Sequence, residues 1–462
     1  MPPLKMFLND TIVAISTPIG EAGLAVVRLS GSKALSVADR VFKPIGQGSL
    51  RPSMAPSHTI HYGFIVRDGV RVDEVLLSVL RAPRTFTRED MVEVSCHGGV
   101  LPAKLVLDTI LAGGARLAEP GEFTKRAFLS GRIDLAQAEA VADLIHSRTE
   151  LALRAAHEQL AGHLSRRIEQ LRNDLTRTLA HVEAHIDFPD EDILPETRSQ
   201  LVSRLEKASV FIEELLRTAP EGQLLRRGVR AAIVGRPNAG KSSLLNQLLG
   251  HDRAIVSPIA GTTRDTIEET ANIRGLPVIF IDTAGLREAG DTLEAEGIRR
   301  SKATIAKAEL ILHVVDATEP ITDEDRRFLD ESANKKRIVV RNKIDLTKLA
   351  PWDDSFATGA VSVSSVTGEG LELLKDSIKA LLWSGGVGGE MLQVMINARH
   401  QETLRRAHFS TAQATEALRQ DQSLELVALD LRIAFNAVGE IVGKTTTEDL
   451  LDSIFSQFCL GK

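Results

Sequence analysis

The sequence contains little cysteine, few aromatic residues and no long apolar run. Its 462 residues include only two cysteines, Cys96 and Cys459, which excludes a disulfide framework or a multi-cysteine metal site and favours a reducing, cytoplasmic environment. Aromatic residues make up 4% of the chain, which leaves few platforms for stacking single-stranded nucleic acid. No stretch of about 20 apolar residues is present, and the start of the chain does not read as a signal peptide. We therefore expect a protein that neither crosses a membrane nor is secreted.

An excess of basic residues is also missing. Lysine and arginine number 56 against 62 acidic residues, and the formal net charge of −6 argues against a protein that coats nucleic acid through general charge. Because domains usually have roughly 150 residues, a chain of this length is expected to form about three of them. With 43% hydrophobic residues, these domains can bury sizeable cores.

The pattern of residues 1–130 predicts an α+β domain. Short β-rich runs accompany one clear helix, "LPAKLVLDTILAGGA". The β-rich runs are "TIVAIST", "GLAVVRLSG", "HTIHYGFIV", "VDEVLLSVL" and "MVEVSCHGG".

Residues 131–227 and 385–462 have a different pattern, in which apolar residues recur at three- and four-residue spacing. In the first of these stretches, a helix beginning near "RSQLVSRLEK" is expected to stop at Pro220 and Gly222. Each stretch has apolar stripes that need a partner, and the simplest partner is the other stretch. The two are therefore predicted to form one discontinuous α-helical bundle.

Residues 228–384 interrupt this bundle. Apolar strands such as "VRAAIVG" and "ELILHVVDA" alternate with helical segments, which is typical of an α/β domain with a mainly parallel sheet. The flexible stretch "SGGVGG" lies at its end. We expect this domain to be inserted into the bundle through two glycine-containing hinges.

The inserted domain begins with a phosphate-binding loop. The strand "VRAAIVG" leads into "GRPNAGKS" and then into the helical "SLLNQLLG", so the motif has the context that it requires. Glycines let backbone amides approach the phosphates, Lys241 reaches the outer phosphates and Ser242 can hold magnesium. The residues predicted to bind here are Asn238, Ala239, Gly240, Lys241, Ser242 and Ser243.

Four further motifs follow in the order found in GTP-binding domains. They are "GTTRD" at 261–265, "DTAG" at 282–285, "NKID" at 342–345 and "SSV" at 364–366. The arrangement resembles the translation-related GTPases. That resemblance implies that Asp282 supports magnesium through water, that Gly285 senses the terminal phosphate and that Thr263 completes the magnesium shell.

The "NKID" motif is expected to read the base. Asp345 can accept hydrogen bonds from the N–H groups of guanine, a pattern that adenine lacks, while Asn342 and Lys343 shape the pocket. The GTP-binding residues predicted in the later motifs are Asp282, Thr283, Ala284, Gly285, Asn342, Lys343, Asp345, Ser364, Ser365 and Val366.

The residue after "DTAG" is Leu286, where many GTPases have a glutamine that orients the attacking water. Another group must therefore position this water. The same segment offers Glu288, Glu294 and Glu296, whose ordinary role would be a solvated helix face, and the pattern alone selects none of them.

The regions that flank the GTPase motifs are more distinctive. They include "TIVAISTPIGEAGLAVVRLSG", "FTREDMVEVSCHGG", "PGEFTKRAFLSGRIDLAQAEAVADLI" and the terminal "FCLGK". Together they resemble the tRNA-modification GTPase family called MnmE or TrmE, and the resemblance covers essentially the whole chain.

The resemblance implies a second site in the N-terminal domain, which would dimerise the protein and bind a formyl-tetrahydrofolate-type one-carbon donor. Arg28, Glu93, Arg132 and Lys462 match the folate-contacting positions of the family. Basic side chains can pair with the carboxylates of a folate, and Glu93 can accept from its pterin N–H groups.

The two cysteines are expected to differ. By the resemblance, Cys459 faces the folate pocket and is required there, as a thiol in the modification chemistry; an ordinary buried or frayed terminal cysteine is the alternative. Cys96 precedes His97, but neighbouring residues of a strand point to opposite faces, so we assign this pair no catalysis.

The resemblance also implies how hydrolysis is activated. A potassium ion would neutralise developing charge in place of an arginine finger. Its ligands would be Asn238, Ser257, Ile259 and Thr262. Glu294 occupies the water-positioning place of the family, so Glu294 and Cys459 are the predicted catalytic residues.

The function implied is that of a homodimeric GTPase that helps to form 5-carboxymethylaminomethyl (aminomethyl-type) groups on the wobble uridine of tRNA. The chain lacks a "GxGxxG" fingerprint and a redox pair, so a flavoprotein partner, MnmG (GidA), would supply the oxidation steps. A ribosome-assembly GTPase of the Era or Der type is the alternative; it predicts an RNA-binding appendage or a second phosphate loop, and the sequence has neither. A slowly hydrolysing signalling switch is the third hypothesis.

Overall fold

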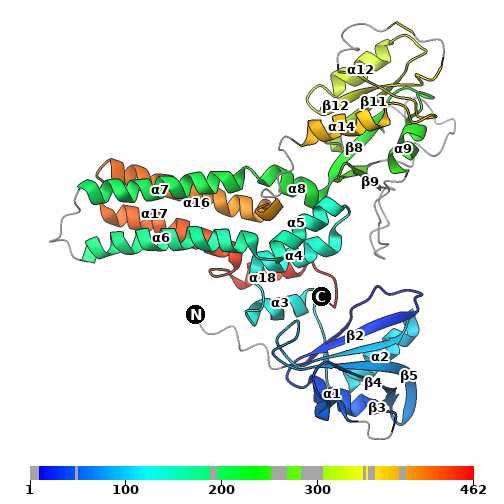
Figure 1. Cartoon of the computed structure of the whole chain (residues 1–462), viewed down its shortest axis with the longest axis vertical. Coiled ribbons are helices and arrows are strands. Elements are labelled where there is room, and N and C mark those ends of the chain that lie inside the picture. The colour runs from blue at the N-terminus through cyan, green and yellow to red at the C-terminus, as the bar shows by residue number, and fades with distance from the viewer. Residues whose placement is uncertain are drawn as a thin grey trace. The chain divides into compact units, whose positions relative to one another are not determined.

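The computed structural model describes residues 10–46, 50–187, 195–250, 268–281, 305–346, 350–351, 359–383 and 392–461 (Figure 1). The backbone divides into two compact units. Unit 1 comprises Met1–Ala142 and Asn436–Lys462, and unit 2 comprises Asp143–Phe435. The four domain ranges given above stay predictions.

Unit 1 contains the predicted α+β domain. Its sheet has the strand order β3-β4-β5-β6-β2-β1-β7, and its neighbouring strands are antiparallel except for the parallel pair β1–β7. Each of the five β-rich runs contains a strand, while β3 and β7 are short additions. The strands are β1 (Ile12–Ile15), β2 (Leu24–Ser30), β3 (Phe42–Pro44), β4 (Thr59–Arg67), β5 (Val70–Leu80), β6 (Met91–His97) and β7 (Arg116–Leu117).

Two helices, α1 (Ala34–Val41) and α2 (Val100–Ala112), pack on one face of this sheet and enclose an apolar core (Figure 1). Helix α2 is the predicted one, whereas α1 was not predicted, because its eight residues are too few to show a clear helical period. On the opposite face of the sheet, Leu24, Tyr62 and Leu76 are exposed. The sheet therefore has one covered face and one face with accessible apolar side chains.

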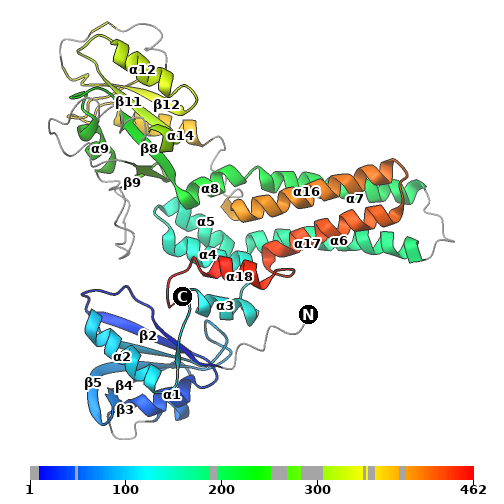
Figure 2. The same ribbon diagram turned by 180° about the vertical axis from the view of Figure 1, so that it is seen from behind.

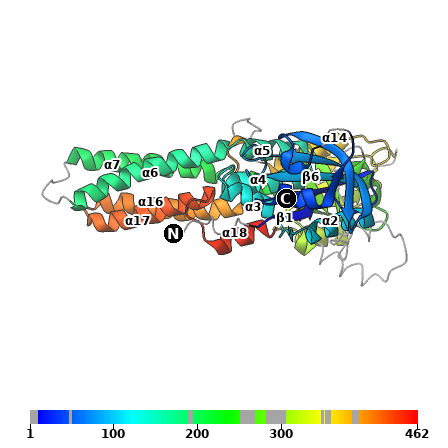
Figure 3. The same cartoon turned by 90° about the horizontal axis from the view of Figure 1, so that it is seen from below.

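The helices before and after the inserted domain pack together, which confirms the discontinuous bundle. Helix α16 lies along α7, and Arg432 of α17 lies 2.7 Å from Glu183 of α6 (Figures 1 and 3). The helices are α3 (Glu122–Leu129), α4 (Leu135–His146), α5 (Glu150–Leu160), α6 (His163–Asp187), α7 (Pro195–Leu216), α8 (Ala219–Arg227), α16 (Ala398–Arg419), α17 (Leu424–Val442) and α18 (Glu448–Phe455). Among the helices that the structure describes, none combines the length and the apolar character needed to cross a membrane.

The expected helix stop at Pro220 is wrong. The preceding helix ends at Leu216, and Pro220 lies in the first turn of α8, which continues through Gly222 to Arg227. Proline is tolerated in a first helical turn, because its missing N–H group would have no intrahelical acceptor there. It therefore starts a helix here instead of ending one.

The inserted domain has the predicted mainly parallel sheet, in the order β13-β12-β11-β8-β10-β9, with only β9 antiparallel to its neighbour (Figure 2). Helices α9, α12 and α14 flank it (Figure 2). The elements are β8 (Val229–Val234), α9 (Lys241–Leu249), β9 (Glu269–Ile273), β10 (Leu276–Phe280), β11 (Leu310–Asp316), α12 (Asp323–Glu331), β12 (Lys336–Asn342), β13 (Val361–Ser362) and α14 (Leu371–Leu382).

The first expected hinge is a packed junction. Gly228 has φ +75°, and a Cβ atom there would lie 2.9 Å from Cδ1 of Ile279. Ala152 of α5 and Leu225 of α8 belong to the same apolar core as the sheet of the inserted domain. The glycine thus permits a close approach of the backbone at this junction.

Candidate functional site

The phosphate loop lies between β8 and α9, where the motif predicts it. Gly235 has φ +140°, and a Cβ atom there would lie 2.1 Å from the carbonyl oxygen of Val314. Gly240 has φ +93°, and a Cβ atom there would lie 2.1 Å from Nδ2 of Asn342. Both positions require glycine, because a larger residue would be strained and would clash. Asn238 also has a positive φ, +62°, a conformation that asparagine adopts more often than most residues other than glycine.

Lys241 begins α9, and its ammonium group reaches back to the start of the loop. Its Nζ donates hydrogen bonds to the carbonyl oxygens of Gly235 (2.8 Å) and Arg236 (2.7 Å). Burial lowers the pKa of Lys241, because desolvation disfavours the charged form. Ser242 and Ser243 follow in the first helical turn. The loop therefore surrounds a helix N-terminus, where free N–H groups favour a bound anion.

Asn342 links three of the predicted motifs. It ends β12, and its Nδ2 donates to the carbonyl oxygen of Ala239 at 2.9 Å, across 103 residues of sequence. Its Oδ1 accepts from the backbone N–H of Ser365 at 3.1 Å and from Oγ of Ser365 at 2.8 Å. One buried side chain thus joins "NKID" to the phosphate loop and to "SSV".

Asp345 is held by the last motif. Its Oδ1 accepts from Oγ of Ser364 at 2.5 Å. That Oγ also accepts from the backbone N–H groups of Val366 (3.3 Å) and Thr367 (3.1 Å). Lys343 instead points to Asp316, with 2.5 Å between Nζ and Oδ2. The described residues of these motifs form one cluster, and their contacts with GTP stay a prediction.

Several predicted site residues lie outside the described part of the chain. They are Ser257, Ile259, Thr262, Thr263, Asp282, Thr283, Ala284, Gly285, Glu294 and Lys462.

The second predicted site lies in unit 1, on the sheet face that α1 and α2 leave uncovered. Arg28 of β2 and Glu93 of β6 are directly opposite each other, and Nε and NH2 of Arg28 each lie 2.8 Å from Oε1 of Glu93. The guanidinium carbon lies 5.8 Å from the ring centre of Phe123, a fully buried residue of α3. A cation, a carboxylate and an aromatic ring therefore meet at one place.

Arg132 is connected to this cluster through a second aromatic residue. Its guanidinium carbon lies 4.9 Å from the ring centre of Phe86, which packs in the same apolar cluster as Phe123. Burial and the charge of Arg88 lower the pKa of Arg132. Sequence reasoning missed Phe86 and Phe123, although they lie in the distinctive stretches "FTRED" and "PGEFTKRAF".

The C-terminal tail reaches the same part of unit 1. Oγ of Ser16, directly after β1, donates to the carbonyl oxygen of Gly461 at 3.1 Å. The backbone N–H of Gly121, directly before α3, donates to the carbonyl oxygen of Cys459 at 3.4 Å. Phe458 is buried against α4 and α18, whereas Cys459 is exposed. The tail is thus anchored by Phe458 and presents its cysteine to solvent.

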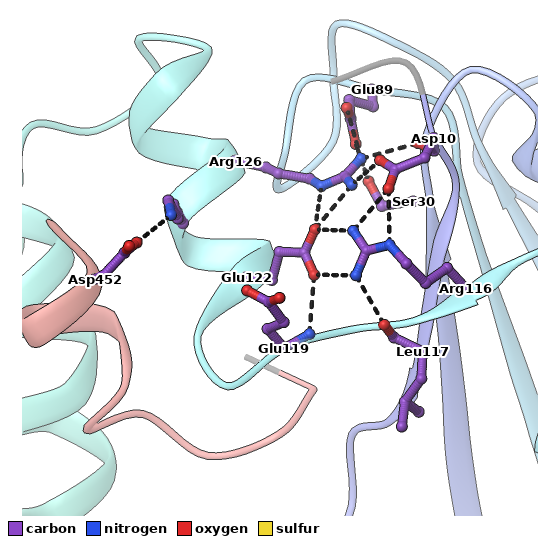
Figure 4. Close-up of polar contacts among 10 residues, drawn as sticks. Asp10, Ser30, Glu89, Arg116, Leu117, Glu119, Glu122, Arg126 and Asp452 are labelled. Carbon is purple, nitrogen blue, oxygen red and sulfur yellow. Dashed lines mark hydrogen bonds and ion pairs between the residues drawn. The ribbon is translucent and has the colours of Figure 1, made fainter. Parts of the chain in front are cut away.

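An ion network connects α3 to β7 and to the residues that precede β1 and β6 (Figure 4). Arg126 of α3 is 2% exposed, and it pairs with Asp10 (2.5 Å), Glu89 (3.2 Å) and Glu122 (2.9 Å). Arg116 pairs with Asp10 and Glu122 at 2.7 Å each. A buried guanidinium needs such partners, since an unpaired charge in the interior is costly.

On its other side the same helix is tied to α18. Lys125 of α3 lies 2.6 Å from Asp452 of α18 (Figure 4). Because Lys125 and Arg126 are neighbours, α3 joins the ion network to the C-terminal helix. The position of Phe123, which underlies Arg28, is therefore fixed from both directions.

Cys96 and His97 point to opposite faces of β6, as predicted. Cys96 is buried in the core, and burial raises the pKa of its thiol to about 11. His97 is exposed, and its ring lies 2.6 Å from Asp73. The buried thiol of Cys96 favours its protonated form and lies on the other face from His97. The histidine therefore does not activate it as a nucleophile.

Two family models match the chain. One, described as GTP-binding protein TrmE N-terminus, matches residues 11–132, and the other, described as MnmE helical domain, matches residues 135–459. The chain is 47% identical over 458 residues to the tRNA modification GTPase MnmE of Listeria innocua, with 98% of this chain and 99% of the relative covered. It belongs to the tRNA modification GTPase MnmE family. The MnmE of Geobacillus kaustophilus is also 47% identical, over 461 residues, with 98% of this chain and 99% of the relative covered.

Membership in the MnmE family makes the chain a GTP-hydrolysing enzyme and sets aside the Era or Der alternative. Among solved structures, the G domain of the T. maritima FeoB iron transporter is 30% identical, covering 33% of this chain and 98% of that domain with a TM-score of 0.25.

Proposed function

We propose that this chain is a homodimeric, potassium-stimulated GTPase that helps to form 5-carboxymethylaminomethyl-type groups on the wobble uridine of tRNA in the cytoplasm. A flavoprotein of the MnmG (GidA) type is its partner in this reaction. The observation that carries the proposal is the presence of two different clusters in one chain. One cluster joins the motifs for a guanine nucleotide through Asn342. The other contains the Arg28–Glu93 pair, in the same unit as the cysteine-bearing tail, which contacts Ser16 and Gly121.

The first cluster fits GTP and its metal ions. Lys241 follows a loop of backbone amides at a helix N-terminus, which suits the phosphates, and Asp345 presents a carboxylate to the guanine N–H groups. Hydroxyl, amide and carbonyl oxygens are the ligands that hard cations prefer. Magnesium would be held by Ser242 and Thr263, and potassium by Asn238, Ser257, Ile259 and Thr262. Bound beside the phosphates, these ions supply positive charge for the transition state.

The second cluster fits a folate. Glu93, held in place by Arg28, would accept from its pterin N–H groups, and Arg132 and Lys462 would pair with the carboxylates of its glutamate tail. Phe86 and Phe123 lie beside the two arginines. Phe86 is partly buried and offers aromatic surface for a flat ring, whereas Phe123 is fully buried and supports Arg28 from below. A formyl-tetrahydrofolate-type cofactor supplies a one-carbon unit when bound, and the exposed thiol of Cys459 takes part in the modification chemistry.

The homodimer is supported by the uncovered sheet face. Tyr62 and Leu76 are directly opposite each other on neighbouring strands and are 47% and 48% exposed, while Leu24 on the same face is 66% exposed. Accessible apolar side chains on a sheet face are typical of a surface that another protein covers.

The proposed function predicts that tRNA from cells lacking this protein loses the aminomethyl-type group at the five position of the wobble uridine. Mass spectrometry of nucleosides from digested tRNA measures this loss, and expression of the intact chain should restore the group. Ribosomal subunit profiles of the same cells serve as the control. Normal wobble uridine together with a subunit-assembly defect would contradict the proposal.

A second prediction concerns hydrolysis. Potassium should accelerate GTP hydrolysis more than sodium does, because the larger ion suits the coordination that the family implies. Glu294→Ala should lower turnover by roughly 10²-fold or more with little loss of nucleotide affinity, since a group that positions water acts in the chemical step. Glu296→Ala, which removes a neighbouring carboxylate, is the matched control and should keep normal turnover. Equal rates in the two salts, or a larger effect of Glu296→Ala, would exclude this mechanism.

A further inference from the structure

The segment 316–325 runs from the last residue of β11 into the first turn of α12, and it contacts both halves of the nucleotide cluster. At its start, Oδ2 of Asp316 lies 2.5 Å from Nζ of Lys343 in "NKID". At its end, the carboxylate of Asp325 lies 3.1 Å from Nε of Arg236 in the phosphate loop. One short segment thus holds a basic residue from each of two loops that are far apart in sequence.

The guanidinium group of Arg236 contacts three residues of this segment, Glu319, Pro320 and Asp325. Its Nη1 lies 2.8 Å from Oε2 of Glu319, and its Nη2 donates to the carbonyl oxygen of Pro320 at 3.5 Å. The side chain is 17% exposed. The carbonyl oxygen of the same residue accepts from Lys241. Holding the guanidinium therefore also fixes the backbone that orients Lys241.

The side chain of Asp325 is fully buried, so its negative charge has to be stabilised by neighbouring groups. Oδ2 accepts from the backbone N–H of Thr322 at 3.0 Å and from its Oγ1 at 2.9 Å. Nε2 of the buried His313 lies 3.8 Å from Oδ1. Burial opposes ionisation, but hydrogen bonds and the charge of Arg236 lower the pKa of Asp325 to about 2. Arg236 therefore has a buried, hydrogen-bonded partner that is ionised at neutral pH.

The other end of the segment holds the base-reading loop in a similar way. Asp316 accepts from the backbone N–H and Oγ1 of Thr318 at 2.9 and 2.7 Å, which leaves its carboxylate oriented toward Lys343. Lys343 has φ +67°, an uncommon conformation for a residue other than glycine. The backbone N–H of Ala317 donates to the carbonyl oxygen of Asn342 at 2.8 Å.

We propose that segment 316–325 is a brace that sets the distance between the phosphate loop and the base-reading loop, with Arg236 and Lys343 as its positioning residues. The inference rests on the proposed placement of GTP in this cluster. A nucleotide contacts both loops at once, so its affinity depends on their separation. In a preorganised site, a misplacement of about 1 Å can lower the rate of a catalysed step by roughly 10²-fold, so the separation of the two loops matters for function.

The two ends of the brace should fail in different ways. Arg236→Gln releases the phosphate loop, and we expect it to speed GDP dissociation by roughly 10- to 100-fold without changing the affinity ratio of GDP to IDP. Asp316→Asn releases the base-reading loop and should lower the affinity ratio of GDP to IDP. IDP, inosine diphosphate, lacks the exocyclic amine of guanine that Asp345 would bind, so this ratio reports on the base-reading loop. Arg236→Lys should restore the GDP affinity in part, since it keeps the charge but not the planar fork. Stopped-flow displacement of a fluorescent GDP measures these rates.

Two controls keep failure of the brace distinct from failure of the GTP site. Arg274→Gln removes ion pairs with Glu372 (2.9 Å) and Asp376 (2.7 Å) in the same domain and should leave the rates unchanged. Asp345→Asn should weaken GDP, and if it does not, the proposed site and the brace both fall. Normal GDP dissociation in folded Arg236→Gln, with Asp345→Asn impaired, overturns the brace alone. The brace is also overturned if the affinity ratio of GDP to IDP falls equally in Arg236→Gln and Asp316→Asn. Thermal unfolding identifies any variant that does not fold.

Discussion

Asp345→Asn should weaken GTP binding by roughly 10²- to 10⁴-fold, because hydrogen bonds to a charged group contribute about 1.5–3 kcal/mol each. The carboxylate accepts from the guanine N–H groups, whereas an amide also presents a donor to them. Xanthine has a carbonyl where guanine has its exocyclic amine, so the variant should bind XTP better than the wild type does. Isothermal titration with GTP and XTP measures both effects.

The structure adds a reason for a large effect. Oδ1 of Asp345 accepts from Ser364, which also caps the turn at Val366 and Thr367, so the carboxylate cannot turn away from the base without disturbing this turn. Asp376→Asn, the same change on α14 of the same domain, is the matched control and should bind GTP normally. Undiminished GTP affinity in Asp345→Asn would mean that "NKID" does not read the base.

The local parts of this site could be predicted because their signals are local. A phosphate loop needs glycine where φ is positive, and Gly235 and Gly240 meet that need, as does the strand–loop–helix context around them. The β-rich runs "GLAVVRLSG" and "MVEVSCHGG" likewise indicated strands, and because neighbouring residues of a strand point to opposite faces, they separated Cys96 from His97.

The connections between these parts could not be predicted, because they join residues that only the fold brings together. Arg126 meets Asp10 and Glu89 from two other segments, and Arg236 meets Asp325 from a helix 89 residues further on. No spacing rule indicates such pairs, since each partner alone reads as a surface charge. At Pro220 a local signal was present but was misread. Proline often ends a helix, but Pro220 lies in the first turn of a new one.

Phe123 illustrates how the predicted and unpredicted parts combine. The family resemblance indicated Arg28 and Glu93, and the ladder between β2 and β6 places them opposite each other. The buried aromatic ring beside Arg28, however, comes from α3, whose position depends on Arg126 on one side and on Lys125 on the other. The tail that carries Cys459 contacts this same helix at Gly121, so the second cluster depends on both ends of the chain.

Removal of residues 459–462 should abolish folate binding and wobble modification while leaving GTP hydrolysis nearly intact. The tail belongs to unit 1, and the phosphate loop and the base-reading loop belong to unit 2. The deletion must spare Phe458, which is 7% exposed and packs in the cluster with Leu135 and Phe455. Loss of that buried ring would cost about 3–5 kcal/mol and would confuse a functional effect with unfolding. Titration with a formyl-tetrahydrofolate and nucleoside mass spectrometry measure the two losses, and phosphate release measures hydrolysis.

Cys459→Ser separates the chemistry of the thiol from the placement of the tail. The backbone of Cys459 holds the tail through its bond from Gly121, and this bond does not depend on the side chain. Serine should therefore leave folate affinity unchanged, while wobble modification is lost, because a hydroxyl is a far weaker nucleophile than a thiolate at neutral pH. Leu460→Ser, a change at the neighbouring exposed residue, is the control and should keep both activities. A Cys459→Ser protein that restores normal wobble uridine to a deletion strain would show that the cysteine has no chemical role.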